Sequence, residues 1–379
     1  MKFFSFALHR PALLALAGAA ILAAAAPAAA QTIAKQVFAK GADVGWLQQM
    51  EATGYVFRNE QGQPQDCLAI LRAQGINSIR LRVFVNPSDD KASGHCSPAE
   101  VVAMAKRATD QGFRVMIDFH YSDTWADPGK QAKPAAWVAH SFAQLLTDVY
   151  DHTFSTMTLL KAAGVTPEWV QVGNEIPGGM LWPEGSTKNP VQLAQLITKG
   201  YEAIKAVSPT SKVVVHLDRG NNNALYRSFF DNLTSNGGKF DVIGMSYYPY
   251  WLKQDYTESI ADLRANLLDM VARYPGKEVV VAEVGNDYTQ VQNTYDLLVA
   301  TQQAVRAVPQ GKGLGVFYWE PEGAKSWSHY QLNAWADDGR PSPALKAFQQ
   351  EPAGQSGPAR RGKATGKPPV FGAPKKTSR

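Results

Sequence analysis

The sequence predicts an α/β protein folded as a single (β/α)8 barrel, the TIM barrel. Short runs rich in β-branched and aromatic residues alternate with longer amphipathic segments along the body of the chain, a pattern typical of parallel sheets covered by helices. Eight such repeats fit into about 310 residues, the length that a closed eight-stranded barrel needs. The alternative is a doubly wound open sheet, but no GxGxxG motif follows the first predicted strand.

Eight segments have the composition and length of buried strands. In chain order they are 37–44, 76–84, 114–121, 169–176, 212–218, 241–249, 278–285 and 313–320. Helical patterns lie between them, for example at Pro98–Arg107 and Val191–Ile197. Gly75, Gly112 and Gly164 follow such patterns at the positions where glycine typically ends a helix.

The first 30 residues are predicted to be a signal peptide. Lys2 and Arg10 precede an apolar run, and the run ends in the small residues Ala28–Ala30 that a signal peptidase requires. A retained membrane anchor is the alternative, because the run is almost long enough to span a bilayer. We therefore expect cleavage after Ala30 and a secreted or periplasmic protein without membrane attachment.

The basic character of the chain comes from its ends. Of the net charge of +5, residues 1–30 contribute +2 and residues 351–379 contribute +6, so residues 31–350 carry −3. A nucleic-acid partner is therefore not predicted. Residues 351–379 are rich in Pro, Gly, Lys and Arg, which predicts a disordered tail after a barrel domain at 31–350.

Side-chain alternation predicts where polar residues gather. Every second residue of a barrel strand points to the axis, and six strands end with an inward polar or aromatic residue: Arg82, His120, Glu175, Asp218, Glu283 and Trp319. The same count turns four more polar residues inward: Arg80, Asp118, Gln171 and His216. Each residue alone is explained by structural hydrogen bonding, but convergence at the carboxyl ends of the strands indicates an active site.

Two of these residues form a pair suited to cleaving glycosidic bonds. Glu175 and Glu283 end the fourth and seventh predicted strands. One carboxyl group must be protonated to donate to the leaving oxygen, and the other must be ionised; a separation of about 5–5.5 Å implies retention through a covalent intermediate. Mutual repulsion and a nearby cation, for which Arg82 is the candidate, would separate their pKa values.

Ordered motifs resemble those of glycoside hydrolase family 53, the arabinogalactan endo-β-1,4-galactanases of clan A. The resemblance runs from about Gly41 to Phe348 and includes "VGNEIPGGMLWP" at 172–183 and "FYWEPE" at 317–322. Further motifs lie at 41–54, 75–87, 118–131, 213–220, 244–251 and 279–285.

The resemblance implies a role for individual residues. Glu175 is expected to be the acid/base, Glu283 the nucleophile and Asn174 the partner of the sugar 2-hydroxyl. The supporting residues implied are Arg82 and Tyr248 as hydrogen-bond donors to the nucleophile, Trp319 as the platform beneath the sugar, and His120 at the same mouth. The substrate-binding residues implied are Asp43, Tyr121, Asp123, Trp125, Asp127, Trp182 and Asp218. For each of these loop residues, capping or loop packing is the alternative.

Other features concern cofactors and cross-links. Export would expose Cys67 and Cys96 to an oxidising compartment, which favours one disulfide over two buried thiols. The last loop, 322–342, is short, and its adjacent Asp337 and Asp338 lack the spaced oxygens of a calcium site. No metal and no cofactor are therefore predicted.

These inferences combine into one functional hypothesis. We expect a secreted, monomeric, endo-acting, retaining hydrolase of β-1,4-galactosidic bonds in galactan or type I arabinogalactan, with the galactan side chains of pectin as its polysaccharide partner. One alternative is an enzyme of the same clan that acts on mannan or glucan, because a barrel fold alone does not set the substrate. The other alternative is a carbohydrate-binding barrel without catalysis.

Overall fold

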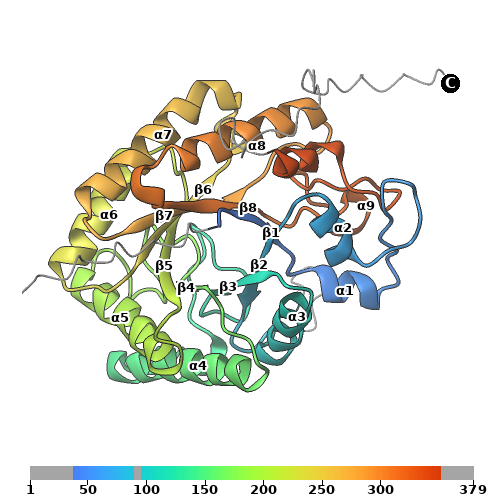
Figure 1. The fold of residues 1–379 in the computed structure, drawn as a ribbon. Helices are drawn as coiled ribbons and strands as arrows, with labels where there is room; N and C mark the ends of the chain where they lie inside the picture. Colours follow the sequence, from blue (N-terminus) through green and yellow to red (C-terminus); the bar gives the residue numbers. More distant parts are fainter. Residues whose placement is uncertain (1–36, 89–94, 351–379) are drawn as a thin grey trace, which may run out of the picture. The chain divides into compact units, whose positions relative to one another are not determined.

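Eight parallel strands close into a barrel, each strand paired with the next along the chain and β8 paired with β1 (Figure 1). The computed structural model describes residues 37–88 and 95–350. The predicted signal peptide and the predicted C-terminal tail lie outside these residues. All eight predicted strands are present, so the predicted (β/α)8 barrel is confirmed.

The strands are β1 (Ala39–Asp43), β2 (Ser78–Val83), β3 (Arg114–Phe119), β4 (Trp169–Val172), β5 (Lys212–Leu217), β6 (Val242–Tyr247), β7 (Glu278–Val284) and β8 (Gly313–Tyr318). All eight predicted segments extend past the carboxyl end of the strand. The difference is largest at β4, where 169–176 was predicted. The residues beyond the strand ends form the turns that carry the polar groups described below.

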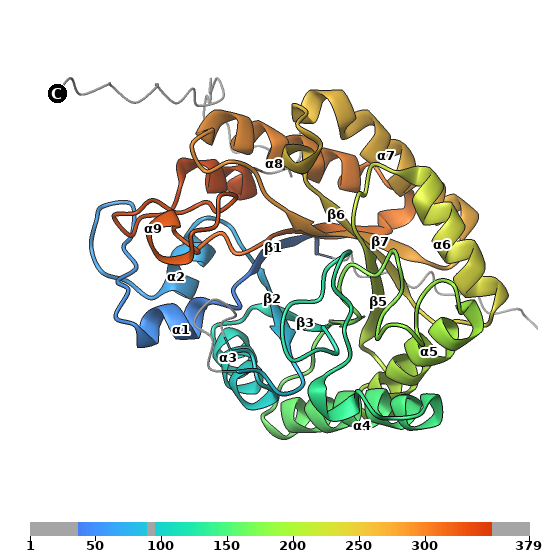
Figure 2. The same ribbon diagram turned by 180° about the vertical axis from the view of Figure 1, so that it is seen from behind.

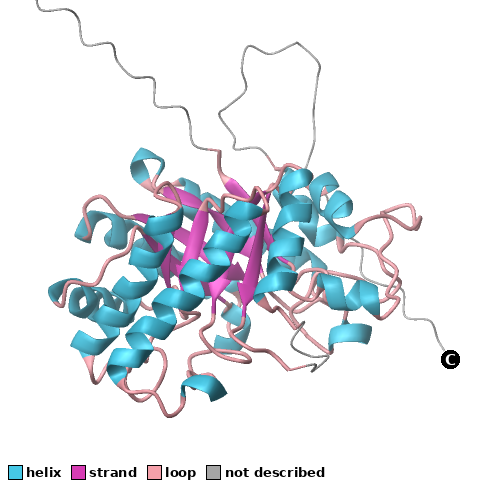
Figure 3. Cartoon of the chain, turned by 90° about the horizontal axis from the view of Figure 1, so that it is seen from below, coloured by secondary structure: helices cyan, strands magenta, loops and turns pink. Residues whose placement is uncertain are grey.

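Helices surround the strands, as seen from both sides of the barrel (Figures 1 and 2) and from below (Figure 3). They are α1 (Leu47–Ala52), α2 (Cys67–Ala73), α3 (Pro98–Asp110), α4 (Phe142–Ala162), α5 (Pro190–Val207), α6 (Asn223–Ser235), α7 (Tyr256–Arg273), α8 (Val291–Arg306) and α9 (Lys325–Ser328). Short 3-10 helices occur at η1 (Ala135–Trp137), η2 (Pro249–Leu252), η3 (Pro309–Gly311) and η4 (Pro343–Gln349).

Local sequence signals explain where the helices begin and end. Ser97 and Glu100 form a capping box that satisfies the first amide groups of α3. Gly75, Gly112 and Gly164 follow the C-cap residues of α2, α3 and α4 with φ of 92°, 77° and 77°. Only glycine adopts this left-handed conformation without steric cost, so the predicted helix ends are confirmed.

The barrel interior changes from apolar to polar along its axis. Trp169 and Phe317 pack edge to face, with ring centroids 6.0 Å apart, in an apolar cluster that also contains Met116. Two residues further along β3 and β4, Asp118 and Gln171 are fully buried. The polar layer therefore lies between the apolar part of the interior and the carboxyl ends of the strands.

The predicted disulfide is wrong, because Cys67 and Cys96 are not joined. Cys67 begins α2 within the apolar core, whereas the Sγ of Cys96 donates to the carbonyl of Gly45 at 3.4 Å. Both thiols are buried, and both belong to the apolar core between strands and helices. Within the described part of the chain, no helix is both long and apolar enough to cross a membrane.

Candidate active site

A cavity of about 540 Å³ opens at the carboxyl ends of the strands. Predicted site residues that line it are His120, Trp125, Asp127, Asn174, Glu175, Asp218, Tyr248, Glu283 and Trp319. Residues at the cavity that were not predicted include Arg219, Asn221, Ser246, Trp251 and Tyr330. Both glutamates thus reach one cavity from β4 and β7.

Four strands are followed by a non-glycine residue in the left-handed backbone region. These residues are Tyr121, Glu175, Arg219 and Glu320, with φ of 50°, 43°, 49° and 46°. Each directly follows a residue that lines the cavity. This conformation costs about 1–3 kcal/mol per residue and is concentrated at functional sites. The carboxyl ends of the strands are therefore held in strained turns that aim side chains at the cavity.

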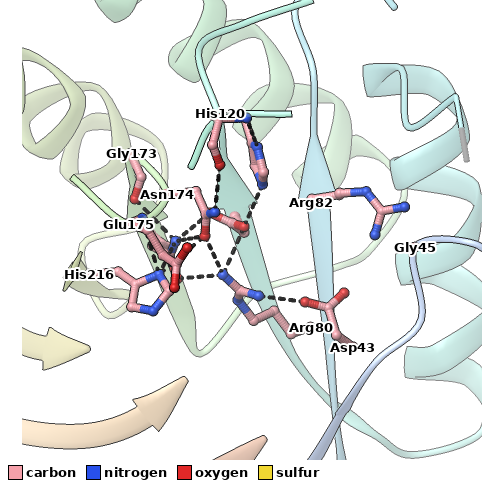
Figure 4. Close-up of polar contacts among 12 residues, drawn as sticks. Asp43, Gly45, Arg80, Arg82, His120, Gly173, Asn174, Glu175 and His216 are labelled. Atoms are coloured by element: carbon pink, nitrogen blue, oxygen red, sulfur yellow. Dashed lines mark hydrogen bonds and ion pairs between the residues drawn. The ribbon is translucent and has the colours of Figure 1, made fainter. Parts of the chain in front are cut away.

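Arg80 is the centre of the buried polar layer (Figure 4). Its Nη1 donates to Oε1 of Glu283 at 2.9 Å and to Oδ2 of Asp43 at 2.5 Å. Its Nη2 donates to Oδ2 of Asp118 at 2.8 Å and to Oδ1 of Asn174 at 2.9 Å. The guanidinium of Arg80 thereby holds the carboxylate of Glu283, which lines the cavity, together with the more deeply buried carboxylates of Asp43 and Asp118.

The prediction that Arg82 holds Glu283 is wrong, because Arg80 does so. The guanidinium of Arg82 points toward Gly45 (Figure 4) and forms an ion pair with Glu320. A Cβ atom on Gly45 would lie 2.1 Å from Nη1 of Arg82, so any other residue there would displace the guanidinium. Alternation turns both arginines inward, but they differ by about 6.6 Å in height along the strand.

Glu283 is held through both carboxylate oxygens. Arg80 donates to Oε1, and the hydroxyl of Tyr248 donates to Oε2 at 3.0 Å. Burial raises the pKa of Glu283, while the positive charge of Arg80 and the hydrogen bond from Tyr248 act in the opposite direction. These two donors favour the ionised form of Glu283.

Among residues 37–88 and 95–350, no cation contacts the carboxyl group of Glu175. Burial raises its pKa well above the usual range, and the negative charges of Glu283 and Asp218 raise it further. A hydrogen bond from the Ser246 hydroxyl opposes this shift. The environment therefore favours a protonated Glu175 beside an ionised Glu283, the division of roles that an acid and a nucleophile require.

The side-chain amide of Asn174 is held by hydrogen bonds to the loop after β3 and to the buried polar layer. Its Nδ2 donates to the carbonyl of Ala126 at 2.8 Å, and its Oδ1 accepts from Arg80 and from Gln171 Nε2 at 3.1 Å. His216 lies 3.1 Å from the same oxygen, and burial lowers the pKa of His216 well below its usual value. A rigid amide therefore stands next to Glu175.

His120 connects the polar layer to the loop after β3. Its Nδ1 accepts a hydrogen bond from the backbone N–H of Ala126 at 3.0 Å, so the ring proton is on Nε2, which faces Asp118 Oδ2 at 3.0 Å. Burial lowers the pKa of His120. The neutral ring thus positions the loop that carries Trp125.

Trp319 lies within a group of aromatic rings that meet edge-on or tilted. Its ring centroid lies 5.3 Å from that of Trp46, 5.7 Å from that of Trp125 and 4.8 Å from that of Tyr330. Such contacts stabilise a fixed orientation. Trp319 therefore presents a rigid flat surface to the cavity.

Four residues predicted to bind substrate do not line this cavity. Asp43 is fully buried and paired with Arg80. Asp123 braces two loops by accepting from the backbone N–H groups of Asn86 and Ala135 at 3.0 and 2.8 Å. Arg80 holds one oxygen of Asp43, and backbone N–H groups hold both oxygens of Asp123. A contact of either residue with substrate stays a prediction.

The other two predicted substrate-binding residues that do not line the cavity, Tyr121 and Trp182, are aromatic. Tyr121 continues the outward alternation of Phe119, stacks on its ring and reaches Thr153 of α4 with its hydroxyl at 2.7 Å. Trp182 donates from Nε1 to the carbonyl of Gly178 at 3.0 Å, within its own loop. Tyr121 is buried behind the strands and does not reach the cavity, so its prediction is wrong. Trp182 is only partly buried, and its contact with substrate stays a prediction.

The described residues contain no group of three or more His, Cys, Asp or Glu that could hold a metal ion. In the last loop, Asp338 pairs with Arg340, and Asp337 accepts from the backbone N–H of Ser326 at 2.8 Å.

A (β/α)8 barrel that gathers two carboxyl groups and several aromatic rings at its mouth has the architecture of a glycoside hydrolase. Comparison with known proteins agrees with this class. The profile of glycosyl hydrolase family 53 matches residues 39–349. The chain therefore belongs to glycosyl hydrolase family 53 and is a glycoside hydrolase.

Relatives and solved structures cover most of the chain. An uncharacterised protein of Niallia circulans is 36% identical over 80% of this chain and 89% of its own length. An endo-β-1,4-galactanase of Bacillus subtilis (strain 168) is 34% identical over 75% of this chain and 70% of its own. The family 53 catalytic domain of Ignisphaera aggregans has a TM-score of 0.77 and 32% identity, and the match covers 82% and 95% of the two chains.

Proposed function

We propose that this protein is an exported, monomeric, retaining endo-β-1,4-galactanase that cleaves galactan and type I arabinogalactan. The observation that carries the mechanism is the pair Glu175 and Glu283 in one cavity, in which only Glu283 receives donors from Arg80 and Tyr248. The name of the Bacillus subtilis relative supports galactan as the substrate class.

In the first step, Glu175 donates its proton to the glycosidic oxygen while a carboxylate oxygen of Glu283 attacks the anomeric carbon. The bond from that carbon to the glycosidic oxygen breaks, and the sugar becomes an ester of Glu283. The hydroxyl of Tyr248 and the guanidinium of Arg80 hold the attacking carboxylate in place.

In the second step, the ionised Glu175 takes a proton from water, whose oxygen attacks the same carbon. The ester bond breaks, Glu283 leaves as a carboxylate, and Glu175 is again protonated. Two inversions give net retention of the β configuration.

The remaining cavity residues would orient the sugar. Asn174, fixed by Arg80 and Ala126, is the proposed partner of the 2-hydroxyl, a contact that strengthens in the transition state. Trp319 is the proposed platform for the apolar face of the galactose at the cleavage point, with Trp125 beside it. Asp127 and Asp218 line the cavity as acceptors for sugar hydroxyls.

A substrate panel tests the proposed specificity. The purified protein is incubated with linear β-1,4-galactan, β-1,4-mannan and cellulose, and reducing ends are followed over time. We expect turnover of galactan alone, with intermediate-length products appearing before short ones, as endo action requires. Turnover of mannan or cellulose without turnover of galactan would overturn the substrate assignment.

The pKa of Glu175 provides a test of the proposed acid/base. The charge of Glu283 contributes to the raised pKa of Glu175, so Glu283→Gln should lower this pKa and move its titration to lower pH. Burial remains in the variant and keeps the pKa above the ordinary value. Titration of ¹³C-labelled glutamate by NMR measures the shift.

A control comes from the opposite end of β7, where Glu278 pairs with Lys212. Glu278→Gln should leave the titration of Glu175 unchanged. An unchanged or increased pKa of Glu175 in Glu283→Gln would contradict the proposed coupling.

A further inference from the structure

A second cavity, of about 610 Å³, lies beside the catalytic cavity at the same end of the barrel. Its walls come from η2 after β6, the residue that caps α7, the turn after β7 and the first turn of α8. Trp251 lines both cavities. The two cavities therefore adjoin at Trp251.

One wall of the second cavity is aromatic. Tyr250 and Trp251 belong to η2 and pack edge to face, with ring centroids 4.9 Å apart and an interplanar angle of 82°. Trp251 is 63% exposed, although most large apolar side chains of the described barrel are buried. The contact with Tyr250 orients the indole of Trp251, and its exposed part supplies the flat apolar surface on which a sugar ring packs.

The rest of the lining includes a connected row of polar side chains. Nδ2 of Asn286 donates to Oδ1 of Asn293 at 2.7 Å, and Nδ2 of Asn293 donates to Oδ2 of Asp255 at 2.6 Å. These bonds link the turn after β7 to α8 and to the cap of α7. Gln290 and Gln254 add exposed amides. Amides both donate and accept, as the hydroxyl groups of a sugar do.

The charges of the second cavity favour no ionic ligand. Its lining includes one cation, Lys253, and one anion, Asp255, and its other polar side chains are neutral. Aromatic rings together with neutral amides in one lining match an uncharged hexose, which has an apolar face and a rim of hydroxyls.

We propose that the second cavity is a distal subsite that binds galactose units of the chain beyond those at the cleaved bond. The inference rests on the proposed function, because it takes its substrate class from the catalytic cavity. Binding energy from this subsite would be available only to long substrates, so it would raise kcat/KM for long chains and leave short chains unaffected.

Substitutions of residues that line only the second cavity test this inference. In Tyr250→Ala and Gln290→Ala, we expect kcat/KM on galactan oligosaccharides of six or more units to fall, by about 10-fold for the aromatic variant. On galactotriose, both variants should stay within about twofold of the wild type. Phe154→Ala, an exposed aromatic position on α4 (38% exposed), is the matched control and should change neither value.

Equal losses on long and short substrates, or no loss on long ones, would overturn the distal subsite while the wild type still cleaves galactan. Failure of the wild type to cleave galactan would instead overturn the proposed function. The same comparison of long and short chains on the glycan that it does cleave would then decide whether the second cavity binds sugar. Circular dichroism of each variant checks that the fold is kept.

Discussion

Glu283→Ala should reduce the turnover of galactan by about 10⁴-fold or more, because a missing nucleophile removes the covalent route entirely. The variant should still fold, since the lost carboxylate is one of several groups around Arg80. Initial rates on linear galactan measure the loss. Added azide should restore part of the activity on an activated aryl galactoside and give an α-configured product.

Glu278→Ala is the matched control for this variant. Glu278 lies at the start of β7, where it pairs with Lys212 at the far end of the barrel from the cavity. Its removal should leave turnover close to that of the wild type. Retention of more than a few per cent of activity by Glu283→Ala would remove Glu283 from the role of nucleophile.

Arg80→Lys should reduce kcat/KM by about 100-fold, because a lysine cannot reproduce the forked bonds to Glu283, Asp43, Asp118 and Asn174. The guanidinium opposes the raised pKa of Glu283. Weakening this contact raises that pKa further, so a higher pH is needed to ionise the nucleophile. The acidic limb of the pH profile of kcat/KM should therefore move to higher pH.

Arg82→Lys provides the comparison on the same strand. Arg82 is equally buried, but its ion pair is with Glu320, and its guanidinium stacks over Trp125 with Cζ 4.2 Å from the ring centroid. Thermal unfolding should show that both variants are less stable than the wild type. Only Arg80→Lys should shift the acidic limb, and a shift of equal size in Arg82→Lys would contradict the assignment of Arg80 to Glu283.

The barrel was predictable because its signal repeats. Eight β-branched runs, each followed by a helical pattern, leave few alternatives. Strand ends were less predictable, as the run 169–176 illustrates. The run ends in the apolar Ile176, but Glu175 adopts φ of 43° and leaves the strand geometry. Strain of this kind depends on tertiary contacts and has no local sequence signal.

Side-chain alternation predicts which residues of the site point to the barrel axis, but it does not predict which of them contact one another along the axis. Alternation turned Arg80 and Arg82 to the axis, yet only the packed structure shows that the deeper arginine meets Glu283. Alternation also explains why Tyr121 points outward with Phe119. Trp251 and Tyr330 come from loops without strand periodicity, so no pattern could assign them to a cavity.

The configuration of the first product tests the central claim most directly, because the claim is that Glu175 and Glu283 cleave by double displacement. Proton NMR of galactan hydrolysis, recorded before mutarotation, separates the two anomers of the newly formed reducing end. The mechanism proposed here predicts that the β-anomer appears first. Initial accumulation of the α-anomer would mean single displacement by water and would contradict the assignment of Glu283 as the nucleophile.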